Sequence, residues 1–446
     1  MVLEQDPIAG ELSLGEARDG SGHRRSTPQD RHSHTVMPLG RSLLASHLPH
    51  VLTELLEAGS AEVPMVDHLP PAIADRQRRA GDDELVGLAC RRTVFESVMR
   101  GAAECHPRVE QRTSVTVDGL DTRPGEPLRI AGVVVNGVVL GADVVVDAGG
   151  RNSPVARWLA DAGVTVPEAT VEPCGVVYFS RFYRRLRPLD LPLNRGLAAG
   201  VFGSVSAAVC FPADNGTTST TLGVLPGDEL ARALAKPDGF TVAARMHPMV
   251  GAWLDPSAAE PISDVAVMTR LNNRMQRLTA NGEPRVHGLV AVGDATCTTN
   301  PAFGRGLSLA MAHAFGLVEA ITSHAGDLEK LATEADRIAH EVLQPWFEDS
   351  VVQDRARIAR WRNEPVPSPP IGRDLDRVMR VAPMDADVWR AAMRRYSLLD
   401  PPDAIFENTA IMAKVADATR RAPATPAPVG PTRAELIAAL SEACLP

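Results

Sequence analysis

Two segments of this 446-residue chain place an acidic residue and glycines directly after an apolar run, which suits them to a ligand with hydroxyl or anionic groups. The first is Gly293-Asp294-Ala295, which follows the run LVAV and precedes NPAFGRG (residues 300–306) and a helical pattern. A carboxylate at a strand end accepts hydrogen bonds from sugar or ribityl hydroxyls. Glycines let backbone N–H groups approach a ligand at a helix N-terminus, whose partial positive charge stabilises an anion. Taken alone, the segment fits an ordinary strand–loop–helix turn equally well.

The second segment, DAGGRNSPVAR at residues 147–157, also lies between a predicted buried strand and a predicted helix. Gly149 and Gly150 permit close approach of the backbone to a ligand. By itself this segment favours a simpler interpretation, a crossover turn in which Asp147 only caps the helix.

Together, the two segments resemble those of the flavoprotein monooxygenases of the p-hydroxybenzoate hydroxylase fold, the group A flavoprotein monooxygenases. Glu4, after an apolar pair, is similar to the acid that binds the adenosine ribose in that family. The sequence CRR at residues 90–92 resembles a helix start whose arginine approaches the flavin. Five further residues resemble the R-x-G-x-P-Q-x-x-H-x-H motif of a branch that includes bacterial polyether and squalene-type epoxidases. They are Arg24, Pro28, Gln29, His32 and His34.

The resemblance, which covers roughly residues 1–345, implies an FAD-dependent, NAD(P)H-using monooxygenase. Such an enzyme transfers one oxygen atom of O₂, through a flavin C4a-hydroperoxide, to a small or medium apolar organic substrate by epoxidation or hydroxylation, here in secondary metabolism. Asp294 would bind the ribityl chain, and the arginines would be cationic contacts. No side chain is identified as catalytic. The implied FAD contacts are Glu4, Arg24, Gln29, Arg92, Asp147, Asp294, Pro301, Gly304 and Gly306.

The expected fold is α/β: a Rossmann-like FAD-binding domain of the glutathione-reductase type, with an inserted, mostly antiparallel β substrate domain and a helical C-terminal region. We assign residues 1–170 and 285–325 to the FAD-binding domain, 171–284 to the inserted sheet, 326–420 to the helical region and 421–446 to a Pro-rich linker and short helix. Asn136-Gly137 predicts a tight hairpin, because both residues accept a positive φ. Gly306 to Ser323 is predicted to be a buried helix, and the run Asp82-Asp83-Glu84 a solvated acidic surface.

One departure from the family pattern concerns the phosphate-binding unit. Proteins of this fold begin with a strand, G-x-G-x-x-G and a helix, and the ribose acid follows about 20 residues past the glycines. Here the corresponding acid is Glu4, and no G-x-G-x-x-G occurs in the sequence. Two interpretations stay open: a natural start about 30 residues further upstream, which we favour, or a short chain with weak or lost FAD binding.

Composition argues against nucleic-acid binding, a membrane-spanning segment and a metal site. A net charge of -9 argues against nucleic-acid binding. No uninterrupted apolar run reaches 18 residues, so we expect no membrane-spanning segment. The six cysteines form no CxxC pair, which favours reduced thiols in a cytoplasmic protein and no metal site. His32-x-His34 is more simply a polar pair at a helix entry than a pair of metal ligands.

Two alternative functions stay open. A flavin reductase of isoprenoid double bonds shares the fold and would not consume O₂. A truncated or non-catalytic paralogue that no longer binds FAD is the second alternative, because the first βα unit is missing. A flavin halogenase is disfavoured, because no W-x-W-x-I-P segment occurs. The sequence decides neither the substrate, nor NADH against NADPH, nor the oligomeric state.

Overall fold

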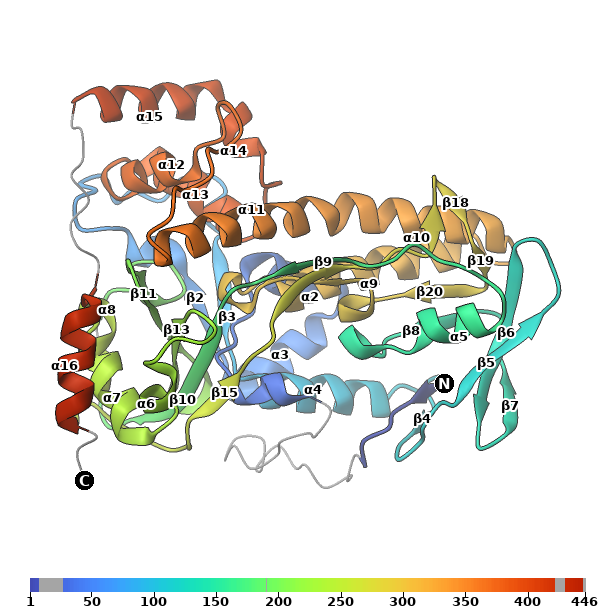
Figure 1. Ribbon diagram of the computed structural model, residues 1–446. Helices are drawn as coiled ribbons and strands as arrows, with labels where there is room; N and C mark the ends of the chain where they lie inside the picture. Colours follow the sequence, from blue (N-terminus) through green and yellow to red (C-terminus); the bar gives the residue numbers. More distant parts are fainter. Residues whose placement is uncertain (8–26, 190, 422–429, 444–446) are drawn as a thin grey trace. The chain divides into compact units, whose positions relative to one another are not determined.

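The computed structural model describes residues 1–7, 27–189, 191–421 and 430–443, and these residues form two compact units (Figure 1). The described residues within Met1–Ser13, Arg100–Cys174 and Asn272–Val351 belong to unit 1. The described residues within Leu14–Met99, Gly175–Leu271 and Val352–Pro446 belong to unit 2.

Unit 1 contains two pairs of parallel strands. Strand β8 (Val145–Asp147) pairs with β20 (Leu289–Ala291), and this register places Asp147 beside Ala291. Strand β1 (Val2–Leu3) pairs with β4 (Gln111–Arg112). Among the described residues, β1 and β8 each have only this one partner strand. Val2 and Val146 are accordingly 49% and 47% exposed, whereas strands inside a parallel sheet are normally covered on both faces.

The remaining strands of unit 1 form a separate sheet around the predicted hairpin. Strands β5 (Gly119–Arg123), β6 (Leu128–Val135) and β7 (Val138–Gly141) are antiparallel, and β19 (Val286–His287) joins β6 in parallel. The turn residues Asn136 and Gly137 have φ angles of 50° and 75°, which confirms the predicted hairpin. Helix α5 (Val155–Asp161) packs against this sheet through Val155 and Leu159.

Two long helices follow β20 in unit 1. Helix α9 (Gly306–Ser323) has the predicted bounds, but it is only partly buried, since Val318 is 59% exposed. It packs through Leu317 and Ala320 against Leu331 and Ile338 of α10 (Leu328–Val342). By length and composition α9 is the one helix in the described part of the chain that is apolar enough to cross a membrane. Core helices of water-soluble proteins pass the same test.

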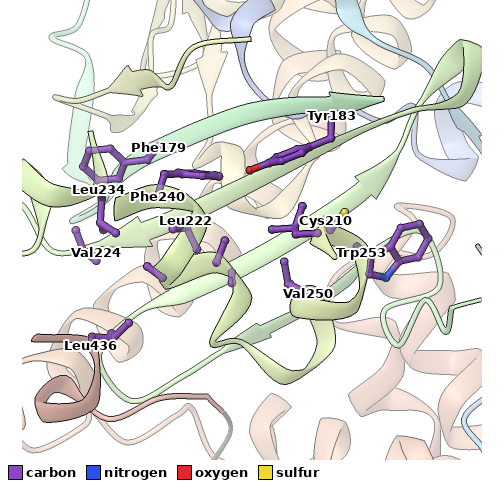
Figure 2. Packing of buried hydrophobic residues seen from close by; sticks show 14 of the residues in the cluster. Phe179, Tyr183, Cys210, Leu222, Val224, Leu234, Phe240, Val250, Trp253 and Leu436 are labelled. Atoms are coloured by element: carbon purple, nitrogen blue, oxygen red, sulfur yellow. The ribbon is translucent and has the colours of Figure 1, made fainter. Parts of the chain in front are cut away.

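Unit 2 is built on an antiparallel sheet with the strand order β11-β12-β13-β10-β14, and β15 also pairs with β10. The strands are β10 (Val177–Arg185), β11 (Ala199–Phe202), β12 (Ala207–Pro212), β13 (Thr217–Val224), β14 (Ala259–Pro261) and β15 (Ala266–Met268). Helices α6 (Ala231–Leu234), α7 (Pro237–Arg245), α8 (Pro248–Gly251) and α16 (Arg433–Ala443) cover one face (Figure 1). Figure 2 shows the resulting core, in which Phe179 and Tyr183 of the sheet lie with Phe240, Trp253 and Leu436 of the helices.

A smaller sheet and further helices complete unit 2. Strands β2 (Ala61–Pro64) and β3 (Val86–Ala89) are antiparallel, and Val36 bridges to Leu88 of β3. The helices include α2 (Pro38–His47), α3 (Pro49–Glu57), α12 (Leu375–Val381), α13 (Ala386–Tyr396), α14 (Ala404–Glu407) and α15 (Thr409–Arg421). Asp82, predicted to be solvated, is instead buried and ion-paired with Arg390 of α13. The region at residues 326–420 is thus helical, as predicted. The boundaries that we assigned to the domains stay predictions.

Candidate functional site

The candidate site is built from the carboxyl ends of β8 and β20 in unit 1, where open α/β sheets generally bind their ligands. Asp147 fixes the turn after β8. Its carboxylate accepts hydrogen bonds from the Gly149 backbone N–H at 2.9 Å and from the Ser153 hydroxyl at 2.6 Å. These two bonds close the turn after β8, but Asp147 does not cap the helix as the simpler interpretation expected, because neither the 3₁₀ helix at Gly150–Asn152 nor α5 has a side-chain cap hydrogen bond.

Asp294 lies in the short 3₁₀ turn η6 (Gly293–Ala295) directly after β20, and its side chain is exposed. Gly293 has a φ of 60°, a conformation that glycine adopts without strain. The turn lies against the first turns of α9, because a Cβ on Gly293 would stand 3.6 Å from that of Ala310. Asp294 is therefore placed where a ligand at the start of α9 could reach its carboxylate.

The nearby Cys297 is not a nucleophile in this arrangement. Burial raises the pKa of its thiol to about 12, and the negative charge of Asp294 acts in the same direction. Since the thiolate is the reactive form, Cys297 stays a protonated, inert side chain at neutral pH.

The loop before α9 is held by buried polar contacts. The Asn300 side chain accepts a hydrogen bond from the Ala302 N–H at 3.0 Å, and the Asn300 N–H donates to Asn273 Oδ1 at 2.8 Å. Gly304 then adopts a left-handed φ of 65°, and α9 begins at Gly306. A Cβ on Gly306 would meet no atom within 4 Å, so the space beside this helix end is open.

Arg305 anchors the same loop, and sequence reasoning did not identify this role. Its guanidinium is sandwiched between the rings of Phe303 and Trp346, at 4.6 and 4.7 Å from their centroids. It is only 3% exposed, forms an ion pair with Asp349 at 2.6 Å and donates to Ser350 Oγ at 2.9 Å. Because its charge is already paired, the positive character facing a ligand at this loop comes from the α9 N-terminus.

One polar atom in the first turn of α9 has no partner. The Ser308 hydroxyl is fully buried and makes no hydrogen bond with any described residue. Buried polar atoms are nearly always hydrogen-bonded in folded proteins, so such an atom calls for an explanation. A ligand bound at the helix end is one group that would satisfy it.

The remaining predicted cofactor residues lie elsewhere. Glu4 follows β1 in unit 1, and its carboxylate accepts a hydrogen bond from the Asp6 N–H at 2.9 Å. Gln29 and Arg92 belong to unit 2, where Arg92 is ion-paired with Glu96 at 2.5 Å. Arg24 lies outside the described residues. Unit 1 thus contains six of the nine predicted residues, and the contacts of all nine with FAD stay predictions; the six are Glu4, Asp147, Asp294, Pro301, Gly304 and Gly306.

Unit 2 contains a chain of hydroxyl groups that the sequence did not reveal. His32 Nδ1 lies 2.8 Å from Ser180 Oγ, and Ser180 Oγ lies 2.6 Å from Thr221 Oγ1. Ser33 Oγ continues the chain at 2.8 Å from Thr221. Ser180 and Thr221 are cross-strand neighbours, and they point away from the core face because Phe179 and Leu222, one position along, face it.

Both histidines of the predicted polar pair are neutral at physiological pH. Burial lowers the pKa of His32 to about 4, although the charge of Asp30 opposes this effect. Burial, with the positive charge of Arg92 as the next cause, lowers the pKa of His34 to about 3. In the described part of the chain no group of three His, Cys, Asp or Glu side chains is placed to hold a metal ion.

Comparison with known proteins gives relatives of one fold. No family model matches the chain. "Protein Rv3254" of Mycobacterium tuberculosis is 28% identical over 417 residues, which is 86% of this chain and 83% of that protein. The P. aeruginosa protein PqsL, solved in complex with 2-aminobenzoylacetate, superposes with a TM-score of 0.57 and 17% identity, over 81% of this chain and 98% of PqsL.

Two further solved structures extend the match. The myxobacterial chondrochloren halogenase CndH, an FAD-dependent halogenase, has a TM-score of 0.57 and 17% identity over 98% of both chains. The p-nitrophenol 4-monooxygenase PnpA of Pseudomonas putida has a TM-score of 0.57 and 17% identity, over 90% of this chain and 97% of PnpA. The predicted fold class is confirmed: this chain has the fold that FAD-dependent monooxygenases and halogenases share.

Proposed function

We propose that this chain is an FAD-dependent oxidoreductase, a monooxygenase that uses NAD(P)H and O₂ on a small to medium organic substrate. The observation that carries the proposal is the N-terminus of α9: an open helix end after a Gly304-Arg305-Gly306 turn, with the exposed Asp294 carboxylate nearby. The shared fold supports the same assignment, because CndH is an FAD-dependent halogenase and PqsL is described as a probable FAD-dependent monooxygenase.

The flavin end of FAD fits these residues. The reduced flavin ring carries negative charge on its pyrimidine side, and a helix N-terminus stabilises such a charge. The missing side chain at Gly306 leaves room for a planar ring against the backbone, and the unpartnered Ser308 hydroxyl would gain an acceptor or donor. Asp294 would accept hydrogen bonds from ribityl hydroxyls. When bound, FAD would supply the redox and oxygen chemistry, which no side chain provides.

The chain's own residues would hold this geometry. Asp147 keeps the turn after β8 closed through Gly149 and Ser153. Arg305, clamped by Asp349 and two aromatic rings, keeps the loop before α9 in place. Such positioning matters because electrostatic stabilisation is effective only when the donors are already oriented.

The adenosine-diphosphate end has no equivalent match among the described residues. Strands β1 and β8 each lack a second partner, Val2 and Val146 are exposed, and the sequence has no G-x-G-x-x-G turn. Both interpretations therefore stay open here: a natural start further upstream that supplies this unit, or a paralogue that binds FAD weakly or not at all.

The substrate class is supported by two neighbours. PqsL is solved with 2-aminobenzoylacetate, and PnpA is a p-nitrophenol 4-monooxygenase, so both have small aromatic ligands. A small organic molecule is therefore the substrate that we propose here. Epoxidation and hydroxylation both remain within the proposal, since neither requires a catalytic base that the structure would have to show.

The test is the stoichiometry of NAD(P)H oxidation by the FAD-loaded protein. A monooxygenase consumes O₂ with each NAD(P)H oxidised, and the rate rises when a substrate is present. If NAD(P)H is oxidised only when a polyprenyl acceptor is added, and no O₂ is consumed, the protein is instead a flavin reductase of isoprenoid double bonds. Protein that binds no flavin and oxidises no NAD(P)H would support the non-catalytic paralogue.

A further inference from the structure

The loop between β10 and β11 of unit 2 presents an arginine that has no counter-ion. Arg195 is half-buried, and its guanidinium makes no ion pair or side-chain hydrogen bond with any residue that the structure describes. Its Nε atom is fully buried without a partner. Burial lowers the pKa of Arg195, yet an arginine remains charged in proteins. An unpaired charge in such a place is costly unless an anion joins it.

Three other buried arginines of unit 2 show what is missing. Arg91 is bonded to Asp214 at 2.7 Å, Arg390 to Asp82 at 2.7 Å, and Arg357 to Asp354 at 2.9 Å. Each of these pairs is internal to the fold. Arg195 instead retains its five N–H donors while part of its surface remains accessible.

The aromatic neighbour of Arg195 leaves those donors available. The guanidinium lies over the Phe202 ring, 4.6 Å from the ring centroid, which is a cation–π contact through one face of the group. Such stacking uses no N–H group, so it leaves the in-plane donors free to match a carboxylate in a two-bond fork. Tyr396 of α13 is close enough to act electrostatically on the same guanidinium.

The loop holds Arg195 in a fixed position. The Asn194 side chain bonds to both the N–H and the carbonyl of Gly200, at 2.8 and 2.9 Å. The Arg195 N–H donates to the Ala198 carbonyl at 3.0 Å. Directly after Arg195, Gly196 has a φ of 74° and Leu197 packs closely against Gly87 of β3. A side chain on a loop that is already ordered in this way loses little conformational entropy when it binds a ligand.

We propose that Arg195 is an anion-binding residue of unit 2, which takes the carboxylate of an aromatic organic ligand with Phe202 beside the ring. The inference rests on the proposed function in one respect: the ligand would be the substrate of the flavoenzyme. It narrows that substrate to an organic anion, which the sequence analysis did not predict.

Binding of benzoate, compared with its neutral isostere benzamide, tests the proposal on the full chain. Isothermal titration and thermal shift are measured on wild type, on R195M, on R195K and on the control R184Q. Arg184 is an exposed arginine of the same sheet, paired with Glu260, so R184Q removes the same charge elsewhere. We expect wild type and R184Q to bind benzoate and to prefer it to benzamide. R195M should lose about tenfold or more in benzoate affinity, and R195K should be intermediate.

Circular dichroism and the melting temperature show whether each variant is folded. Removing an unpaired charge should leave the melting temperature of unliganded R195M equal to or above that of wild type. Equal benzoate affinity in R195M and wild type, equal binding of benzamide, or no benzoate binding at millimolar concentration would each overturn the proposal. Asp190, which lies outside the described residues, is the last control. If R195M strongly lowers the stability and adding D190N to R195M restores it, Arg195 serves an internal ion pair, and the proposal is overturned.

The measurement is made with and without added FAD, so that two failures are separable. Benzoate binding through Arg195 in a protein that binds no flavin would contradict the proposed function and leave the anion site standing. Flavin binding without benzoate binding would contradict the anion site alone.

Discussion

Replacing Arg305 by Met tests the claim that a buried ion pair holds the loop before α9. The substitution removes the pair with Asp349, the bond to Ser350 and both ring contacts, and Asp349, which is only 12% exposed, loses its arginine partner. Breaking a buried pair in this way costs about 3–5 kcal/mol, and the slight exposure of Asp349 favours the lower value. A loss of about 3 kcal/mol corresponds to roughly a hundredfold faster local opening.

Hydrogen exchange followed by mass spectrometry measures this opening directly. We expect faster exchange in peptides that cover residues 300–310. The matched control is Arg337→Met, because Arg337 of α10 is 50% exposed and paired with Glu334, and exposed pairs contribute less than about 1 kcal/mol. The double variant R305M/D349L should recover part of the loss, since no charge is then left unpaired. Equal effects of R305M and R337M, or no recovery in the double variant, would refute the reasoning.

Three further predictions concern the cofactor site and the dependence of stability on pH. Asp294→Asn should weaken FAD binding about tenfold or more in a flavin fluorescence titration. The control Asp143→Asn, which lies just before β8 at the end away from the site, should not weaken it. Equal effects of the two substitutions would contradict the ribityl role of Asp294. Ser308→Ala should raise the free energy of unfolding without FAD by about 1 kcal/mol and lower FAD affinity; lower stability would show a structural partner for this hydroxyl. Burial lowers the pKa of His32 and of His313 to about 4, so the native state resists protonation that the unfolded state accepts near pH 6.5. Stability should therefore be full above pH 6.5 and fall as the pH decreases toward 4, and His313→Gln should flatten this decline in urea unfolding.

Local features of the fold were predictable from the sequence because they depend on neighbours in the chain. The Asn136-Gly137 turn needs only two residues that accept a positive φ, and the structure has it. The helix at 306–323 follows from its composition and its flanking glycines, and its bounds are those predicted. The two predicted strands that carry the acidic segments are present and pair in parallel as β8 and β20, but the prediction that the first of them is buried was wrong, because Val146 of β8 is 47% exposed.

Partners far apart in the chain were not predictable. Arg305 and Asp349 are separated by 44 positions, and nothing in the NPAFGRG segment shows which carboxylate neutralises its arginine. The Asp82 prediction was wrong for the same reason: three acidic residues in sequence are typical of a surface, and the partner Arg390 lies 308 positions away. The chain from His32 to Ser180 and Thr221 needs strand register as well as sequence, because the register decides which hydroxyls share a face.

The visible absorption spectrum of the purified chain, after mixing with FAD and removal of free flavin, tests the central claim most directly. The account predicts retained flavin bands, shifted and sharpened relative to free FAD by the less polar surroundings at the α9 N-terminus, and weaker retention in Asp294→Asn than in Asp143→Asn. A folded protein that retains no flavin, or that retains it equally in both variants, would contradict the proposed site.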